Sequence, residues 1–309
     1  MPREPRAAGK SELVALLDEH SRAWTARPVL RRLYREWFEA IVARLSGVGG
    51  TSIELGSGLG KLRDVAGTRL VLTDVEPTPW VDAQADALDL PYADASLANI
   101  VMVDVFHHLG NVARFLDEAE RALAPRGRVV LVEPYCSPVS TPLYRRFHHE
   151  RTDPAVDPFT ADTSIEANAL ASNQALATLV FFRHVERLRR RWPALRIVER
   201  KRFALVLYPL SGGFSRPSLI PARAYSPLRV LETLLRPLAP ALAFRCLVVL
   251  EKTPSDPHRP HLQLVVAEDG HPQEKQTMAE PRDVRPSVRA RGVPHGNVDD
   301  PESSARRPQ

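Results

Sequence analysis

The chain has 309 residues, of which 44% are hydrophobic and 26% charged, and its formal net charge is +5. This composition supports a sizeable core, and two distant cysteines, Cys136 and Cys246, exclude a disulfide framework and a zinc-finger spacing. No apolar region follows the basic N-terminus and the longest apolar stretch, 238–250, contains Pro240 and Arg245, so we predict neither a signal peptide nor a membrane span. The cysteine usage fits a reducing cytosol, so we expect a cytoplasmic protein.

Residues 12–45 have the apolar spacing of one or two amphipathic helices, with a break at Pro28. Their apolar positions recur along one helical face at Leu30, Leu33, Trp37, Ile41 and Leu45. We therefore expect an N-terminal helical segment over residues 1–48.

From residue 49 onward, apolar runs alternate with helical patterns. The runs at 51–55, 69–74, 97–104 and 128–134 predict strands, and 111–123 predicts a helix with Asn111 as its N-cap. Such alternation favours right-handed βαβ crossovers and a mainly parallel sheet. The predicted fold class is α/β, a Rossmann-like sheet with helices on both faces.

The second half of the chain adds an insertion, residues 136–192, which we expect over the carboxyl edge of the sheet. It ends in a predicted helix at about 174–192; further strands are predicted over 195–210 and 242–253, and a helix over 228–236. The main domain thus spans 49–253. Residues 254–309 contain no aromatic side chain and are predicted to be a disordered tail.

Positive charge is concentrated between Arg183 and Arg202, where nine Lys/Arg and two acids give +7. Three interpretations stay open: a solvated helix face, a patch that attracts an anionic acceptor, or contact with an anionic membrane surface. Nucleic acid is not expected as a partner because interleaved aromatic residues are few.

The stretch IELGSGLGKL, residues 53–62, places Gly56, Gly58 and Gly60 directly after the first strand. Glycines there permit positive φ or close approach of the backbone to a ligand. A plain tight turn is the alternative, but acids follow the next strands. Asp74 ends the second, and Asp86, in ADALDLPYADASL, follows what we interpret as a short third strand before the run at 97–104. A carboxylate at the position of Asp74 suits the ribose of an adenosine-containing cofactor.

These motifs, with VDVFHHL and FLDEAERALAPRGRVVLVEP, resemble the class I S-adenosylmethionine-dependent methyltransferases of the small-molecule type 11 branch, over about 51–134. The resemblance implies S-adenosyl-L-methionine as cofactor, with the backbone of Gly56, Ser57 and Gly58 under its methionine part and Glu54 at its amino group. Asp74 would hold the ribose. The full set of expected cofactor-binding residues is Glu54, Gly56, Ser57, Gly58, Gly60, Asp74, Val75, Asp86, Ala87 and Asp104.

The chain departs from the family in three places. Only twelve residues separate Asp74 from Asp86, so a short turn replaces the usual helix, and either Asp74 or Glu76 could reach the ribose. Ala98 stands where the family has an Asp, and Arg126 with Gly127 replaces a glycine pair. We expect the last two changes to be structural.

Methyl transfer needs alignment of the acceptor and removal of a proton when the acceptor is a hydroxyl or ammonium. Candidate bases follow the fourth and fifth strands: His107, His108, Glu133 and Tyr135. The structural alternative for the histidine pair is that one caps a turn and the other packs against the insertion. His148, His149 and Glu150 are interpreted as a solvated polar loop, and no metal site is predicted.

The predicted function is methyl transfer from S-adenosyl-L-methionine to a small-molecule, lipid-linked or sugar-linked acceptor. An anionic acceptor and peripheral contact of the protein with a membrane are both compatible with this prediction. One alternative is an NAD(P)-dependent oxidoreductase, against which the G-x-G-x-G spacing argues, since the dinucleotide fingerprint is G-x-G-x-x-G. Another is a non-catalytic binding or assembly module with this fold.

Overall fold

The computed structural model describes residues 7–162, 165 and 171–254, and all structural statements below concern these residues. By its internal contacts the chain divides into two units, Met1–Pro257 and His258–Gln309, of which only the first is described. The predicted disordered tail therefore lies outside the described residues, apart from Pro254.

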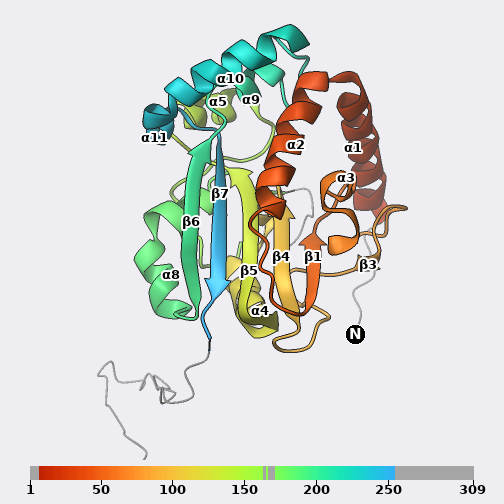
Figure 1. The fold of residues 1–309 in the computed structure, drawn as a ribbon, viewed down its shortest axis with the longest axis vertical. Helices are drawn as coiled ribbons and strands as arrows, with labels where there is room; N and C mark the ends of the chain where they lie inside the picture. The colour runs from red at the N-terminus through yellow and green to blue at the C-terminus, as the bar shows by residue number, and fades with distance from the viewer. Residues whose placement is uncertain (1–6, 163–164, 166–170, 255–309) are drawn as a thin grey trace, which may run out of the picture. The chain divides into compact units, whose positions relative to one another are not determined.

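A seven-stranded sheet with the order β3-β2-β1-β4-β5-β7-β6 organises the first unit (Figure 1). Strands β1 to β5 are mutually parallel, and β7 is antiparallel to both β5 and β6. The predicted α/β sheet is thus confirmed, with an antiparallel pair at one side. The strands are β1 (Thr51–Leu55), β2 (Val71–Asp74), β3 (Ala83–Gln84), β4 (Leu97–Val103), β5 (Leu123–Pro134), β6 (Leu195–Phe203) and β7 (Arg245–Lys252).

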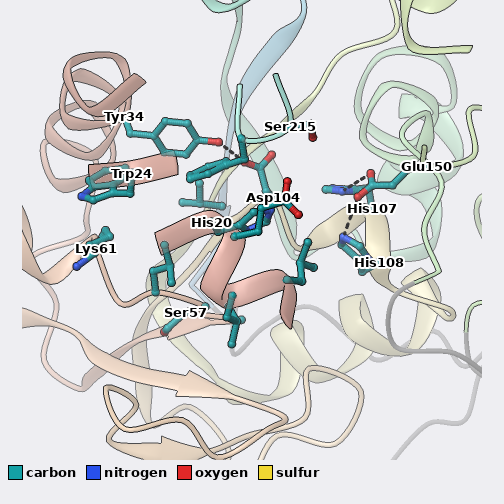
Figure 2. A pocket seen from close by; sticks show the side chains of 18 of the residues that line it. His20, Trp24, Tyr34, Ser57, Lys61, Asp104, His107, His108, Glu150 and Ser215 are labelled. Atoms are coloured by element: carbon teal, nitrogen blue, oxygen red, sulfur yellow. Dashed lines mark hydrogen bonds and ion pairs between the residues drawn. The ribbon is translucent and has the colours of Figure 1, made fainter. Parts of the chain in front are cut away.

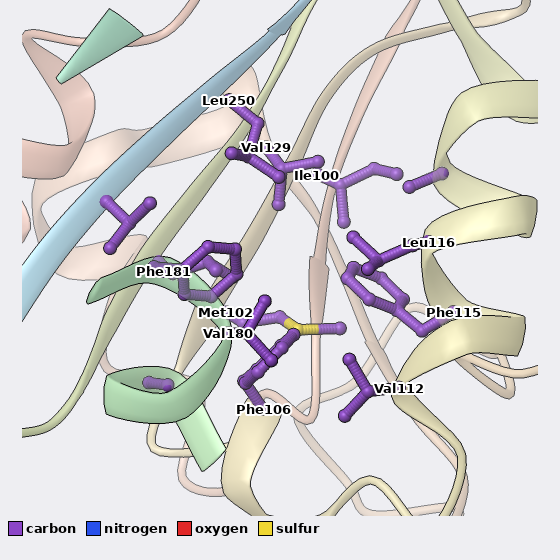
Figure 3. Close-up of a cluster of buried hydrophobic side chains, with 14 of the residues drawn as sticks. Ile100, Met102, Phe106, Val112, Phe115, Leu116, Val129, Val180, Phe181 and Leu250 are labelled. Carbon is purple, nitrogen blue, oxygen red and sulfur yellow. The ribbon is translucent and has the colours of Figure 1, made fainter. Parts of the chain in front are cut away.

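Both faces of the sheet are covered, as parallel sheets require. Val129 and Leu131 of β5 belong to one apolar cluster and Val130 and Val132 to another, which is the alternation of a strand buried on both sides. In Figure 3 the first cluster packs α4 (Val112–Ala122) and η3 (Leu179–Arg183) against the sheet. The second is built on α2 (Pro28–Val42) and α9 (Leu207–Ser211).

The N-terminal helices are α1 (Ala7–Ala26) and α2, and Pro28 is the first residue of α2. Proline fits there because the first turn of a helix needs no N–H from it. Short elements complete the parallel part of the fold: α3 (Arg63–Ala66), η1 (Gly67–Arg69) and η2 (Phe106–His108).

The second half differs from prediction in two places. The predicted strand over 195–210 ends at Phe203, because Ala204 takes a positive φ of 61° and the chain turns into helix α9. The predicted helix at 174–192 is divided into α7 (Leu176–Thr178), the π-helical η3 and α8 (Val185–Arg191). The remaining elements are α5 (Ser140–Phe147), η4 (Ala222–Ala224), α10 (Tyr225–Leu234), η5 (Arg236–Leu238) and α11 (Ala239–Leu242).

Candidate functional site

The glycine loop leaves β1 in a conformation that side chains disfavour. Gly56, Gly58 and Gly60 have φ values of 65°, 50° and 64°. A Cβ on Gly56 would lie 2.5 Å from Cγ2 of Val105, so glycine is required there for close approach as well. A Cβ on Gly58 meets nothing nearer than 4.0 Å, which leaves the backbone of Gly58 open to the cavity that it lines.

Glu54 is the buried acid of this loop. Its side chain is 4% exposed, and Oε2 has no hydrogen-bond partner among the described residues. Burial raises the pKa of Glu54 to about 8. A buried carboxylate oxygen without a partner is costly, so a cationic ligand group at this position would remove a penalty that the protein otherwise carries.

Asp74 supports the loop from the end of β2. Its Oδ2 accepts a hydrogen bond from the N–H of Gly58 at 3.1 Å, and its Oδ1 accepts one from Glu76 at 3.3 Å. Burial raises the pKa of Asp74, although the hydrogen bond from Gly58 opposes this rise. Asp74 therefore fixes the loop, and it does not line the cavity.

The other residues expected near the adenosine half lie outside the cavity. Val75 and Asp86 are exposed, Ala87 is buried, and Asp86 accepts a hydrogen bond from the N–H of Leu88 at 2.8 Å. Trp80, which the motifs did not single out, donates its indole N–H to the carbonyl of Gly58 and lies beside Gly60. The turn that replaces the family helix thus closes against the loop through Trp80.

A cavity of about 640 Å³ opens between the glycine loop and the N-terminal helices (Figure 2). One side is formed by Glu54, Gly56, Ser57 and Gly58, and another by α1 and α2. The third side carries Asp104 and a group of histidines: His107, His108, His148 and His149. Seven predicted site residues therefore share this cavity: Glu54, Gly56, Ser57, Gly58, Asp104, His107 and His108.

Asp104 takes part in a network of charged and hydroxyl groups. It has a positive φ of 59°, and its carboxylate accepts from both terminal nitrogens of Arg245 and, at 2.8 Å, from the hydroxyl of Tyr34. Arg245 of β7 is buried; burial lowers its pKa, but the charge of Asp104 outweighs that and the pKa lies well above its usual value. Since this carboxylate is already held, Asp104 is placed to shape the cavity wall.

Glu133 is a buried carboxylate that organises the turn after β4. Its Oε1 accepts from the N–H groups of Val105 and Phe106, both at 2.8 Å, and its Oε2 lies 2.7 Å from Nδ1 of His107. Burial disfavours the imidazolium, but the carboxylates of Glu133 and Glu150 outweigh it and raise the pKa of His107 to about 10. A protonated His107 is not a proton acceptor at neutral pH, which argues against its predicted role as a base.

His108 is the histidine with a free lone pair. Its Nδ1 lies 3.1 Å from the carbonyl of Ala171, which fixes the N–H there and leaves Nε2 unprotonated. Burial, with the charge of His107, lowers the pKa of His108 to about 4. The insertion approaches from the other side through Glu150, whose carboxylate lies 3.3 Å from Nε2 of His107 and 3.8 Å from Nε2 of His108.

Among these contacts, the sequence did not reveal Arg245, Trp80 or the approach of Glu150 to His107. Arg245 and Glu150 are far along the chain from the residues that they contact, and Trp80 lies in a turn that carries no recognisable motif. The one available signal was HHE at 148–150, whose proximity to HH at 107–108 depends on the path of the insertion.

Comparison with known proteins agrees with this geometry. Residues 53–131 match the family model described as a methyltransferase domain. Residues 53–131 therefore have the sequence pattern of a methyltransferase domain, and the seven-stranded sheet to which they contribute β1 to β5 has a Rossmann-like fold. A search of curated proteins found no match.

Solved structures resemble the chain weakly. A chain from the complex of the Haloferax volcanii Trm112 methyltransferase activator is 17% identical, with 81% of this chain and 100% of that chain covered and a TM-score of 0.46. Geranyl diphosphate C-methyltransferase of Streptomyces coelicolor is 14% identical, with 72% of this chain and 81% of that chain covered and a TM-score of 0.42. A SAM-dependent methyltransferase of Archaeoglobus fulgidus is 12% identical, with 72% of this chain and 94% of that chain covered and a TM-score of 0.44.

Proposed function

We propose that the protein transfers a methyl group from S-adenosyl-L-methionine to an acceptor bound beside the histidines of the cavity. The observation that carries the proposal is the glycine loop with the partnerless Oε2 of Glu54 at its start. When bound, the cofactor supplies an electrophilic methyl group on a sulfonium. These features match the methionine half of the cofactor, because the carboxylate of Glu54, which has no partner for Oε2, lies next to the accessible backbone of Gly58.

The residues of this chain have separate tasks in such a reaction. Glu54 would pair with the ammonium of the cofactor, and the backbone at Gly58 leaves room for its chain. His108, neutral and with Nε2 toward the cavity, is the better placed of the two histidines to accept a proton from the acceptor. A pKa of about 4 makes it a weak base, so it suits an acceptor that loses its proton easily.

Titration calorimetry with S-adenosylmethionine, S-adenosylhomocysteine and NADH tests the cofactor. We expect micromolar binding of both adenosyl compounds, about −8 kcal/mol, and none of NADH. Gly58→Arg fills the open backbone and should abolish binding with an unchanged circular dichroism spectrum, whereas Gly47→Ala, with nothing within 4 Å of the added Cβ, serves as the control. Binding of NADH alone would establish the oxidoreductase alternative instead.

The acceptor class that we propose is lipidic. Of the eleven exposed large hydrophobic residues in the described part of the chain, eight lie in α5 and its start or in 219–238, including Leu219 (75% exposed) and Leu234 (71%). The chain between Gly212 and Phe244 also has four arginines and one acid, the buried Glu232. Arg229 pairs with Glu36 and Glu232, whereas Arg216, Arg223 and Arg236 have no ion pair among the described residues. Exposed apolar side chains with three unpaired arginines nearby suit the surface of an anionic membrane.

This surface adjoins the cavity. The N–H of Val139 donates to the carbonyl of Ala241 at 3.2 Å, which joins the start of α5 to α11, and Tyr144 of α5 lines the cavity with Phe214. Figure 1 shows both α5 and α10 beyond the carboxyl ends of the parallel strands. A lipid acceptor could therefore pass from the membrane surface to the histidines along one side of the protein.

Vesicle co-sedimentation tests the lipid proposal. We expect binding to vesicles of phosphatidylcholine with 30% phosphatidylglycerol, weaker binding at high salt, and at least a fivefold loss for Leu234→Glu. Val198→Glu is the matched control, because Val198 is an exposed apolar residue on the edge strand β6. Equal loss in both variants, or no binding at all, would remove the membrane surface from the proposal and leave a free small molecule as acceptor.

A further inference from the structure

We propose that His107, His108 and Glu150 form a binding site for a divalent transition-metal ion on the acceptor side of the cavity. The three side chains come from η2 and from the loop after α5, and their candidate ligand atoms all lie within 4.8 Å of one another. All three line the cavity, and Figure 2 shows both rings directed toward the Glu150 carboxylate. This inference goes beyond the proposed function and changes one part of it: with an ion bound, the Nε2 lone pair of His108 is a metal ligand and no longer accepts a proton from the acceptor. Binding of the ion can be tested without methyl transfer.

The orientation of the two imidazoles supports the site. Histidines that bind metals through one ring nitrogen usually donate the other N–H to a carboxylate or a carbonyl. Here Nδ1 of His107 is held by Glu133 at 2.7 Å and Nδ1 of His108 by the carbonyl of Ala171 at 3.1 Å. Each Nε2 therefore faces Glu150, at 3.3 Å for His107 and 3.8 Å for His108. A bound ion would take the place of the proton that His107 carries on Nε2, so binding releases a proton, and the groups that orient both rings are already in place.

The distances permit an ion with little rearrangement. An ion about 2.0–2.2 Å from each ligand atom places those atoms roughly 3–3.5 Å apart. The Nε2 of His107 lies 3.3 Å from Oε2 of Glu150, and the Nε2 of His108 lies 3.8 Å from Oε1. Since all the candidate ligand atoms lie within 4.8 Å of one another, small movements of the side chains would bring them to these separations.

The ligand types restrict the metal. Two imidazoles and one carboxylate suit zinc, iron(II), nickel or cobalt, whereas magnesium and calcium prefer oxygen ligands alone. Three protein ligands leave positions for water or for an oxygen of the acceptor on the cavity side. The ion would then hold the acceptor by that oxygen.

A second group of ligands, His148, His149 and Glu150, shares the same carboxylate. It is less well prepared, because Nδ1 of His148 already accepts from the N–H of Glu150 at 3.4 Å and His149 is 67% exposed. The helix α5 ends at Phe147, so the two histidines lie in a loop, and their stacked rings are 4.8 Å apart. The proposal commits to the first group.

Calorimetry with zinc chloride, in the absence of cofactor and acceptor, tests the site on chelator-treated full-length protein. We expect one ion per chain, at least a 100-fold loss of affinity in His108→Ala and Glu150→Gln, and no heat with magnesium. Those two side chains are partly exposed, so the variants should fold, and circular dichroism checks this. His184→Ala, which removes an imidazole elsewhere, is the matched control.

Cobalt(II) adds a spectroscopic readout, because its visible absorption reports bound nitrogen ligands and should disappear in His108→Ala. No zinc binding, or binding that His108→Ala and Glu150→Gln leave unchanged, would overturn the proposal. Binding lost in His149→Ala but retained in His108→Ala would overturn it too, since the ion would then occupy the other group. These outcomes are independent of whether the protein binds S-adenosylmethionine.

Discussion

Glu54 is the residue at which stability and proposed binding conflict. Its pKa of about 8 lies above its ordinary 4.5, so the folded protein keeps a proton that the unfolded chain releases. The contribution of Glu54 to the free energy of unfolding of the ligand-free protein is therefore greatest below pH 4.5, and it falls as the pH rises toward 8. A bound ammonium group reverses the effect, since it favours the ionised carboxylate.

Glu54→Gln should separate these two effects. Loss of a charged hydrogen bond of about 1.5–3 kcal/mol predicts an affinity for S-adenosylmethionine that is about 10- to 150-fold weaker at pH 8. The ligand-free variant should lose less stability than the wild type between pH 5 and 9 in thermal unfolding. Glu186→Gln, an exposed acid on α8, is the control. Unchanged affinity would place the ammonium elsewhere.

At the scale of elements, the basic stretch 183–202 occupies two separate places. Arg187 and Arg189 of α8 pair with Asp157 and Glu186, while Arg200 and Arg202 belong to β6 and contact the insertion and Tyr135. β6 is the edge of the sheet. Charged residues on an edge strand discourage pairing with another chain, so the interpretation of a solvated surface fits this stretch best.

Four of the five parallel strands, β1, β2, β4 and β5, were predictable because each contains an apolar run that ends in a turn signal, and helix 111–123 because Asn111 caps it. β3 consists of two exposed residues and has no apolar run. The Asn111 side chain does accept from the N–H of Arg114 at 3.0 Å. The pattern of apolar residues could not predict which strands pair when they are far apart in the sequence. β7 inserts between β5 and β6, and the positive φ of Ala204 turns the chain where the pattern still indicates a strand.

The candidate site divides in the same way. Local sequence identified the glycine loop and the histidine pair, since glycines at positive φ and polar residues at strand ends are local features. It could not assign the protonation of His107 or His108, because that depends on Glu133 and on Glu150, 26 and more than 40 residues away. The predicted contacts of Asp74 and Asp86 with a cofactor stay predictions.

At the scale of the whole unit, Arg245 ties the last strand to the cavity. It connects β7 to Asp104 after β4, to Tyr34 of α2 at 3.4 Å and to Tyr208 of α9 at 3.0 Å. Because these segments span most of the described chain, loss of this one cation should be felt in global stability.

Arg245→Met should destabilise the protein by about 3–5 kcal/mol, because it leaves the charge of Asp104 without its partner. Asp104→Asn combined with Arg245→Met should recover part of that loss, since the pair is removed together. Urea unfolding of the two single variants and the double variant measures the coupling. If the double variant loses the sum of the single losses, Arg245 acts through packing on Tyr208 and Trp37 and not through the ion pair.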